Sequence, residues 1–427
     1  MNSKIKVWHL FIFLCVLLII IRFTTIVGVI WLLVSHFILF INDFHSALNQ
    51  ISFNIIDNYF SALLILVLPL VVFFKLKNFK IFQATLDFSN FIITSLVFLF
   101  IFSPMVSYSH PDFQKNVRVT KLLPPLSKVL YLKFEPLSKH KQFSIDEFVV
   151  QKNEVIKSAF DEKIIFVDSI RLDNRITFYQ NQKVSEISLD SLKAINIVPL
   201  LNKKFFLLGT DEFGRDIFSR LIYGARVSIF VGICTVSVAF LIGFLFGFIS
   251  GYWGGLSDLI LNRLSDMFLS FPTIFLIIVI LALFGNSMLA VIIVLGLSGW
   301  MSLFKIVRSE VISLKQKDFF LTAKLIGLST KNLLLNEVLP IILTPIIVNL
   351  VFLFGSVILA EAALSYLGLG VGNNYPSWGG MIDAGQDYLK EAWWMIFFPG
   401  FALILTLYAA NDVGQKVKIY FNPMLKR

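Results

Sequence analysis

The sequence predicts an all-α polytopic membrane protein with about eight transmembrane helices and one small β-containing insert. Of its 427 residues, 57% are hydrophobic and 46 are phenylalanine, whereas soluble domains contain roughly 45–50% apolar residues. Several windows exceed the about 18 apolar residues that are needed to cross a bilayer. One long hydrophilic stretch, residues 107–206, interrupts these runs. We therefore expect a helical membrane bundle with one domain outside the bilayer.

Charge and the chemistry-bearing residues exclude most other classes of protein. The net charge of +10 favours contact with anionic lipid on the cytoplasmic side, and we expect no nucleic-acid partner. The two cysteines lie in apolar runs and the five histidines are scattered over the first 140 residues, so neither set predicts a disulfide or a metal site. No G-x-x-x-x-G-K-[ST] phosphate loop occurs. We predict no catalytic residue, metal or cofactor, and expect energy to come from a partner or an ion gradient.

Residues 1–80 contain two predicted spans. The apolar run 8–41, which Arg22 interrupts, follows Lys4 and Lys6. It is too long for a signal peptide and lacks a small-residue cleavage site, so it predicts an uncleaved anchor that crosses once or forms two short helices. Lysines at positions 75, 77 and 80 follow the second span, residues 61–74, and mark that end as cytoplasmic. The polar segment 42–59 is then outside, and both termini are expected in the cytoplasm.

A third span and a polar insert follow. Residues 81–106 hold a span at 88–106, which exits to the outside and leads into the insert, residues 107–206. Prolines at 124, 125 and 136 break the first part of the insert. The segments 163–170 and 175–180 are rich in β-branched and aromatic residues and predict strands. The insert is interpreted as a spacer or lid that packs on the membrane domain, or as a docking surface for a soluble partner.

The predicted membrane core, residues 207–427, opens with the motif LLGTDEFGRDIFSRLIYGARVS. Glycines at 209 and 214 supply turn flexibility around a charge cluster, which taken alone is consistent with a salt-bridged helix cap. The cluster consists of Asp211, Glu212, Arg215 and Asp216. Five spans follow at residues 227–251, 273–283, 288–304, 341–367 and 393–410, the last with Trp393 and Trp394 as expected interfacial anchors. With the three earlier spans, these make eight crossings.

Three features inside the core are candidates for helix packing or for a translocation path. Gly243, Gly247 and Gly251 recur at four-residue spacing, which predicts a face for close helix approach or else a chance row facing lipid. Asp266 lies just before a span. Glu361 lies deep within one, where a carboxylate is costly and faces protein or water. It is interpreted either as a structural hydrogen-bonding residue or as part of the path.

A folded basic loop, residues 313–340, lies between two apolar spans. It predicts a helix, a break at Gly327, a second helix and a stop at Leu339-Pro340, with lysines at 315, 317, 324 and 331. The positive charges after the preceding span place this loop in the cytoplasm. A structured loop there predicts contact with a soluble protein.

Residues 207–427 strongly resemble the inner-membrane permeases of the dipeptide/oligopeptide/nickel class of ABC transporters, most closely the second of their two paired permeases. The resemblance rests on several motifs in order. They are the opening motif above, GYWGG, RLSDMFLSFP, the cytoplasmic loop, LAEAALSYLGLGV followed by PSWGGMI, and the closing NPMLK. With span 88–106 as the first, the last six spans are expected to form a type I ABC importer permease core.

The resemblance implies a homologous permease partner, two cytoplasmic ATPases that bind ATP, an extracytoplasmic solute-binding protein, and a location in the cytoplasmic (inner) membrane. It assigns ATPase coupling to the loop, where Asp318 opens the stretch and Ala323, Gly327, Leu339 and Pro340 match the family's pattern. Leu321 and Thr322 replace the family's usual Glu and Ala, which weakens one polar contact with the ATPase. The extracytoplasmic motif is carried by Gly209, Thr210, Asp211, Gly214, Arg215 and Asp216.

Two other functions compete with an ATP-driven importer. An ion-gradient-driven secondary transporter predicts inverted repeats and several buried charges, but no clear repeat is visible and Glu361 is nearly alone. A structural or signalling membrane protein with an outer sensor domain would rest on the insert by itself. The sequence does not identify the substrate, whether dipeptide, oligopeptide or nickel.

Overall fold

The computed structural model describes residues 5–136, 145–172, 175–180, 183–188, 197–325, 338–372 and 375–421. Within this part of the chain, seven helices are long and apolar enough to cross a membrane, and a bent helix pair makes eight when it is counted as one span. The predicted class is therefore confirmed: a helical, multi-pass membrane protein with small β-sheets.

The chain divides into two compact units, and four of the five divisions fall within a helix. The first unit is Met1–Asp87, Thr94–Arg226 and Ala384–Pro399, and the second is Phe88–Ile93, Val227–Asp383 and Gly400–Arg427. The first holds the N-terminal helices and the insert, whereas the second holds most of the long helices of the C-terminal half.

The N-terminal helices of the first unit pack on one another around an apolar core. Their bounds are α1 (Val7–Asn42), α2 (Phe44–Asn49), α3 (Phe53–Phe74), η1 (Leu76–Asn78), α4 (Lys80–Gln83) and α5 (Phe88–Val106, from residue 94). The run 8–41 forms one helix with a kink at Arg22, where φ is −113° and ψ is 20°. Cys15 of α1 is fully buried with Ile65 of α3 and Phe102 of α5. Burial of such apolar side chains inside the bundle favours close helix packing.

The second span begins earlier than predicted, because most of the polar segment 42–59 is helical. Helix α2 occupies its first half, and α3 begins at Phe53, eight residues before the predicted start of that span at residue 61. The polar residues of this added part have partners within the first unit. Asn54 donates to the Lys157 carbonyl at 3.0 Å, and Asp57 is ion-paired with Arg226. Paired polar side chains are tolerated in a buried helix.

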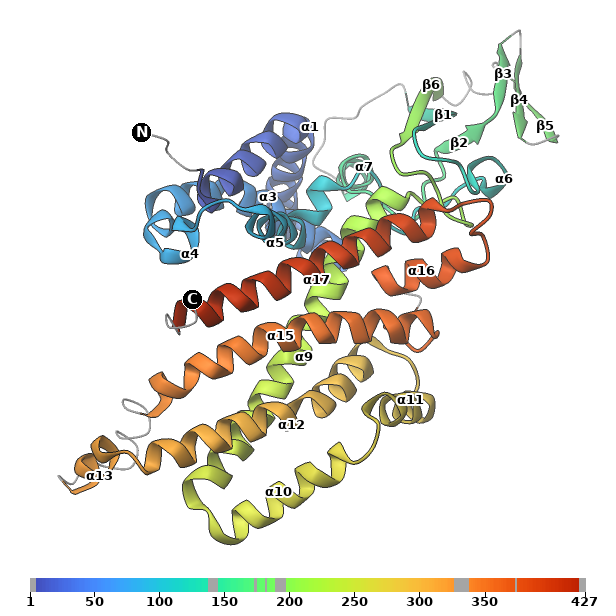
Figure 1. The fold of residues 1–427 in the computed structure, drawn as a ribbon. Helices are drawn as coiled ribbons and strands as arrows, with labels where there is room; N and C mark the ends of the chain where they lie inside the picture. Colours follow the sequence, from blue (N-terminus) through green and yellow to red (C-terminus); the bar gives the residue numbers. More distant parts are fainter. Residues whose placement is uncertain are drawn as a thin grey trace. The chain divides into compact units, whose positions relative to one another are not determined.

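The insert forms two three-stranded antiparallel sheets (Figure 1). Its elements are α6 (Val117–Thr120), β1 (Ser127–Pro136), α7 (Ile145–Val155), β2 (Ile164–Val167), β3 (Ser169–Leu172), β4 (Arg175–Gln180), β5 (Lys183–Ser188) and β6 (Ile197–Phe206). The sheet orders are β2-β1-β6 and β3-β4-β5. The single strand predicted at 163–170 is wrong: the chain changes sheets at Asp168, because β2 pairs with β1 whereas β3 pairs with β4.

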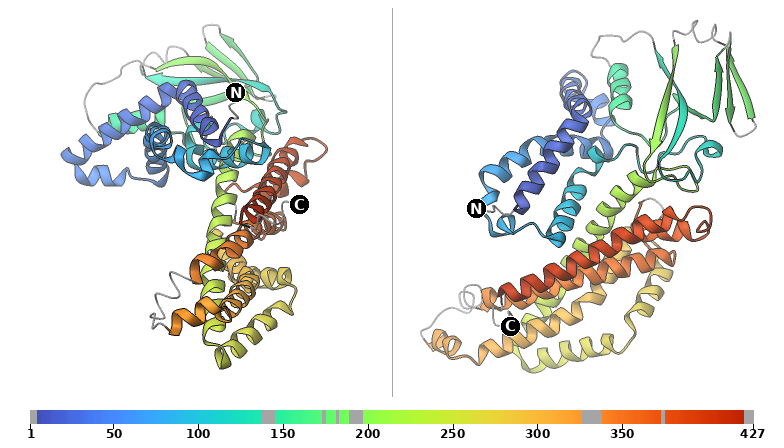
Figure 2. Two further views of the ribbon diagram at one scale, coloured as in Figure 1. Left: turned by 60° about the vertical axis from the view of Figure 1, so that its left-hand side comes forward. Right: turned by 45° about the horizontal axis from the view of Figure 1, so that its top comes forward.

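Long helices make up the second unit, and α12 and α15 lie side by side (Figure 2). The helices are α9 (Ile217–Trp253, from residue 227), α10 (Gly255–Leu269), α11 (Thr273–Phe284), α12 (Met288–Lys315), α13 (Asp318–Leu325), α15 (Leu339–Tyr366), α16 (Trp378–Gln386, to residue 383) and α17 (Trp394–Phe421, from residue 400). The predicted span 273–283 is too short alone. It reaches spanning length only with α10, across an 85° bend.

Helices α9, α12 and α17 extend beyond their predicted spans. Helix α12 continues from residue 304 to Lys315, because its charged residues find partners on α10. Helix α17 continues from 410 to Phe421, where Lys416 pairs with Asp412 one turn earlier. Charged residues mark the end of an apolar run, but they do not end a helix when i,i+4 or interhelical pairs stabilise them.

Candidate functional site

The motif 209–216 forms a tight loop at the start of α9, in the first unit. Gly209 has φ +82°, and a Cβ there would lie 2.5 Å from the Leu123 carbonyl oxygen, so only glycine fits. Thr210 Oγ1 donates to the Thr120 carbonyl at 2.6 Å and accepts the Leu123 N–H at 2.8 Å. The Trp394 indole donates to the Thr210 carbonyl at 3.1 Å. Trp394 is therefore a buried hydrogen-bonding residue, which corrects its predicted role as an interfacial anchor.

The charged side chains of this motif are ion-paired or hydrogen-bonded, either within the motif or with neighbouring residues. Arg215 Nε lies 2.6 Å from Asp211 Oδ2, and Arg220 Nη1 lies 3.0 Å from Asp112 Oδ1. Asp216 accepts the Ser219 N–H at 3.1 Å, which caps the first turn of α9. Burial raises the pKa of the Glu212 carboxyl, and the neighbouring Asp211 adds to this rise. The geometry is that of a salt-bridged helix cap.

The three glycines of α9 lie against α12 in the second unit. A Cβ on Gly243 or on Gly247 would lie 2.7 Å from a carbonyl oxygen of α12, that of Trp300 or Phe304 respectively. A Cβ on Gly251 would lie 2.9 Å from the carbonyl oxygen of Arg308. Each step of four residues on α9 thus meets a step of four on α12. We call this contact the glycine seam, and its backbones approach closely because side chains are absent.

Ion pairs hold α10 to α12 near the end of the glycine seam. Arg308 Nη2 donates to Asp258 Oδ2 at 2.7 Å, and Lys305 Nζ lies 3.0 Å from Asp266 Oδ1. The structure therefore places Asp266 in a half-exposed interhelical pair. Lys315 donates to the Tyr252 carbonyl at 2.6 Å, at the C-terminal end of α9. A cation there is favourable, because the last carbonyls of a helix lack intrahelical partners.

Glu361 of α15 is fully buried among serine hydroxyls of the second unit. Its carboxylate accepts Ser365 Oγ at 2.7 Å and Ser228 Oγ at 3.4 Å, and Ser377 donates to Ser365 Oγ at 3.3 Å. In the described part of the chain, no cationic side chain pairs with it. These serines come from α9, α15 and the residue before α16, so the carboxylate joins three elements.

Most of the predicted coupling residues lie just before or just after residues 326–337, which are outside the described part of the chain. Asp318 begins α13, Ala323 lies within it, and Leu339 and Pro340 begin α15, whereas Gly327 lies outside the described residues. Phe320 and Val338 are buried against Val311 of α12 and Ile342 of α15. Both edges of the segment are thus packed on the ends of the two long helices. At the end of α13, Leu325 is 87% exposed.

Comparison with known proteins decides the family. A family profile described as "Binding-protein-dependent transport system inner membrane component" matches residues 243–415. The "Dipeptide transport system permease protein DppC" of Alkalihalophilus pseudofirmus is 38% identical over 218 residues, which cover 51% of this chain and 72% of that protein. The chain belongs to this family of binding-protein-dependent transport permeases. The predicted resemblance to the DppC/OppC-like ABC permeases is thereby confirmed.

Two further relatives extend the comparison. The "Oligopeptide transport system permease protein OppC" of Bacillus subtilis is 35% identical over 219 residues, 51% of this chain and 72% of that protein. A solved structure titled "Inward facing conformations of the MetNI methionine ABC transporter" covers 46% of this chain and 96% of its own, with 14% identity and a TM-score of 0.36. That structural likeness is too low to add to the assignment.

Some candidate features of this permease lie within the range that the family profile matches, and others precede it. Residues 243–415 include the glycine seam, the ion pairs of α10, Glu361 and the coupling segment. The N-terminal helices and the insert precede the matched range. In the described chain, no group of three or more His, Cys, Asp or Glu side chains could hold a metal ion.

Sequence reasoning missed a group of cations that caps α5. Arg22 of α1 donates to the Ser107 carbonyl at 2.7 Å, and Lys157, which follows α7, donates to the Pro104 carbonyl at 3.3 Å and also to that of Ser107. These carbonyls lie at the C-terminal end of α5, where cations are favourable. The charge of Arg22 within an apolar run was the available signal, since such a residue needs a partner.

Proposed function

We propose that this permease is the transmembrane subunit of an ATP-driven importer for peptides. It pairs with a homologous permease, and two cytoplasmic ATPase subunits bind and hydrolyse ATP beneath the pair. A solute-binding protein delivers the peptide from outside. The proposal rests on the family assignment together with relatives whose names state dipeptide and oligopeptide transport. The absence of a phosphate loop from the sequence fits a subunit that takes its energy from a partner.

In this proposal the segment 313–340 couples the ATPases to the membrane helices. Both edges of the segment pack on the ends of α12 and α15 through Phe320 and Val338. A displacement of the segment would therefore move these helix ends. Because α9 and α12 are closely packed at the glycine seam, α9 would move with α12. Rigid-body movement of packed helices is a common way to switch between two states. The exposed Leu325 offers an apolar contact for the ATPase.

The orientation follows from the same proposal. The coupling segment must face the cytoplasm, and the described helices make eight crossings when α10 and α11 count as one span. Both termini are then cytoplasmic, and the insert between α5 and α9 is extracytoplasmic. Residues 207–427, with the α5 span, form the permease core in the cytoplasmic (inner) membrane, whereas residues 1–80 and the insert are additions to it.

Co-purification tests the coupling. The chain is expressed with its permease and ATPase partners and purified in mild detergent, and bound subunits are quantified by mass spectrometry. Wild type should retain the ATPase, and Gly327→Pro should lose most of it. Gly400→Ala is the matched control, because a Cβ at Gly400 meets nothing within 4 Å. An ATPase that stays bound to the Gly327→Pro variant at the wild-type level would contradict the coupling role.

Uptake into proteoliposomes tests the substrate and the energy source. The assembled transporter should accumulate labelled di- and oligopeptides only with ATP and the binding protein present. Nickel is supplied in a parallel experiment, and uptake of nickel without peptide uptake would reassign the cargo. Peptide uptake by the chain alone, driven by an ion gradient, would overturn the ATP-driven mechanism in favour of a secondary transporter.

A further inference from the structure

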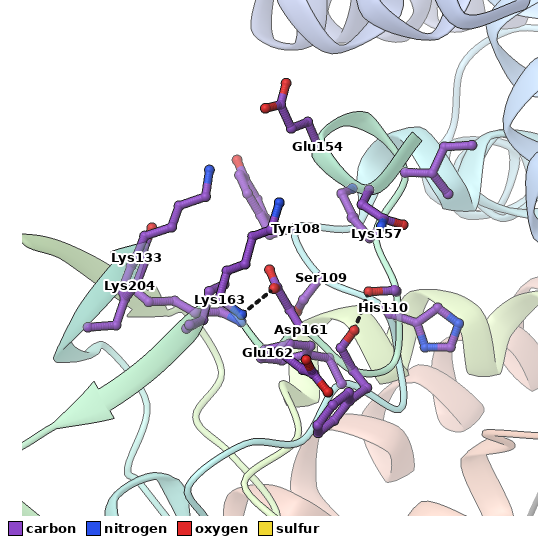
Figure 3. A pocket seen from close by; sticks show the side chains of 17 residues that line it. Tyr108, Ser109, His110, Lys133, Glu154, Lys157, Asp161, Glu162, Lys163 and Lys204 are labelled. Atoms are coloured by element: carbon purple, nitrogen blue, oxygen red, sulfur yellow. Dashed lines mark hydrogen bonds between the residues drawn. The ribbon is translucent and has the colours of Figure 1, made fainter. Parts of the chain in front are cut away.

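The insert contains a cavity of about 540 Å³ that the transport function does not use. It lies wholly in the first unit, between the loop after α5, the end of α7 with the loop that follows, and the strands β1 and β6 (Figure 3). Cavities of a few hundred to 1,000 Å³ are the size that holds small organic molecules. The nature of the ligand can be argued from the lining.

Two lysines of the lining lack a carboxylate partner. The Lys204 ammonium lies 4.6 Å from the ring centre of Phe113 and 5.1 Å from that of Phe206, and in the described chain no carboxylate forms an ion pair with it. Burial lowers its pKa to about 8, against the opposing charge of Asp216. Lys157 has two backbone carbonyl partners. An ammonium carries three N–H donors, so one remains for a ligand.

Burial also lowers the pKa of Lys157, to about 7, and the charges of Arg22 and Lys204 lower it further. The charged form of both lysines is thus disfavoured in the folded protein. A bound anion would lower the free energy of that form, because an opposite charge nearby favours it. In the view of Figure 3, Lys133 and Lys204 lie on one side of the cavity and Lys157 on the other. Lys157 and Lys204 line the same cavity, so an anionic group bound there can approach either ammonium.

Carboxylates of the lining argue against a purely anionic ligand. Asp161 is fixed by the Lys163 N–H, which donates to its Oδ1 at 2.9 Å, and it lies between the lysines in Figure 3. Glu154 and Glu162 are exposed parts of the lining. Aromatic rings complete the walls, among them Phe113 and Tyr131. The cavity therefore offers cationic, anionic and apolar surfaces within a volume that suits one small molecule.

We propose that this cavity binds a small zwitterion, an amino acid or short peptide, through its carboxylate, its ammonium and an apolar side chain. The carboxylate pairs with Lys204 and Lys157, and the ammonium pairs with Asp161. The side chain packs on Phe113 and Tyr131. A ligand without a carboxylate would leave Lys204 unpaired, and one without an ammonium would meet the acidic side chains uncompensated. This site goes beyond the proposed transport function and does not depend on it.

Calorimetry on the purified full chain in nanodiscs, with no ATPase or binding protein present, measures this binding directly. The probe is the dipeptide Gly-Phe, with Gly-Phe amide and N-acetyl-Gly-Phe as analogues that lack the carboxylate charge and the ammonium charge. We expect saturable binding of Gly-Phe and about tenfold or greater weakening for each analogue, because each analogue loses a hydrogen bond between charged groups. No saturable binding, or equal binding of all three compounds, would overturn the proposal.

A pair of variants on β6 locates the site. Lys204→Met keeps the apolar stem beside the rings and should weaken Gly-Phe binding about tenfold or more. Lys203→Met is the matched control, because successive side chains of a strand point to opposite faces and Lys203 is exposed. A second variant, Asp161→Asn, should abolish the preference for Gly-Phe over its N-acetyl analogue. Equal losses in the Lys203 and Lys204 variants would contradict the assignment to this cavity, whether or not the chain transports peptides.

Discussion

Arg226 of α9 and Asp57 of α3 form a two-pronged ion pair between helices that are far apart in the sequence. Arg226 Nη2 lies 2.7 Å from Asp57 Oδ1, and Nη1 also bonds to Oδ2. The side chains are 24% and 7% exposed, so the pair is largely removed from solvent. Asp57 lies in the N-terminal helices, before the range that the family profile matches. The pair therefore attaches these additional helices to the start of α9.

Removing one partner of this pair should destabilise the first unit. Asp57→Ala leaves the Arg226 guanidinium without its counter-charge, and breaking a buried pair in this way costs about 3 kcal/mol or more. The thermal midpoint of the purified protein, followed by tryptophan fluorescence, should fall clearly. The double variant with Arg226→Met should regain much of the loss, because no unpaired charge remains. A double variant as unstable as Asp57→Ala would show that the charge pairing is not the cause.

This ion pair shows what local sequence could not predict. The glycine row of α9 could be predicted because a four-residue period places its members on one face of a helix. The partner of that face, α12, follows only from packing. Asp57 precedes the predicted span 61–74 and Arg226 precedes the predicted span 227–251, and nothing in the sequence around either residue pairs them. The start of α3 was predicted too late because the partners of its polar residues are also distant in the sequence.

The insert was predicted less completely than the membrane helices. A long apolar run identifies a span by itself, whereas a short strand depends on its neighbours. The segment 163–170 has the composition of one strand, but its two halves pair with different partners and separate at Asp168. The cavity of the insert draws lysines from β1, β6 and the loop after α7. These lysines are far apart in the sequence, so only the fold of the insert brings them to one cavity.

Substitution of Gly247 should disrupt the glycine seam. A Cβ there would lie 2.7 Å from the Phe304 carbonyl oxygen and 2.8 Å from Val307 Cβ, and a backbone atom cannot move aside as a side chain can. Gly247→Ala should therefore destabilise the protein by about 1–3 kcal/mol, measured as a lower thermal midpoint. Gly400→Ala in α17 is the control and should be neutral or stabilising by up to about 1 kcal/mol. Equal effects of the two variants would refute close packing as the role of Gly247.

Stability should rise with pH in a way that depends on Lys157. Its folded pKa is about 7 because of burial, with the charges of Arg22 and Lys204 adding to the shift and that of Asp216 opposing it. An unfolded lysine has a pKa of about 10.4. Between these values the unfolded state holds a proton that the folded state lacks, so the free energy of unfolding increases as pH rises. Below about pH 7 both states are protonated and this contribution is flat.

The slope of the thermal midpoint between pH 6.5 and pH 9 measures this effect. Lys157→Met should reduce the slope, because the variant lacks the group whose pKa differs between the folded and unfolded states. Lys128→Met, at an exposed position of β1, should leave the slope as it is. Lys204, with a pKa lowered to about 8, contributes in the same direction, so part of the slope should persist. An unchanged slope in Lys157→Met would show that this lysine is not the titrating group.

Glu361 offers a test between a structural role and a place in the translocation path. Its carboxylate accepts hydrogen bonds from serines at 2.7 and 3.4 Å and is fully buried. Glu361→Gln keeps an acceptor oxygen for these hydroxyls, so stability and peptide uptake should stay close to wild type. Glu361→Leu leaves buried hydroxyls without their acceptor, each at a cost of about 1–3 kcal/mol, and should lower the thermal midpoint. If Glu361→Gln instead abolishes uptake while the midpoint is unchanged, the negative charge itself is needed, and Glu361 belongs to the path.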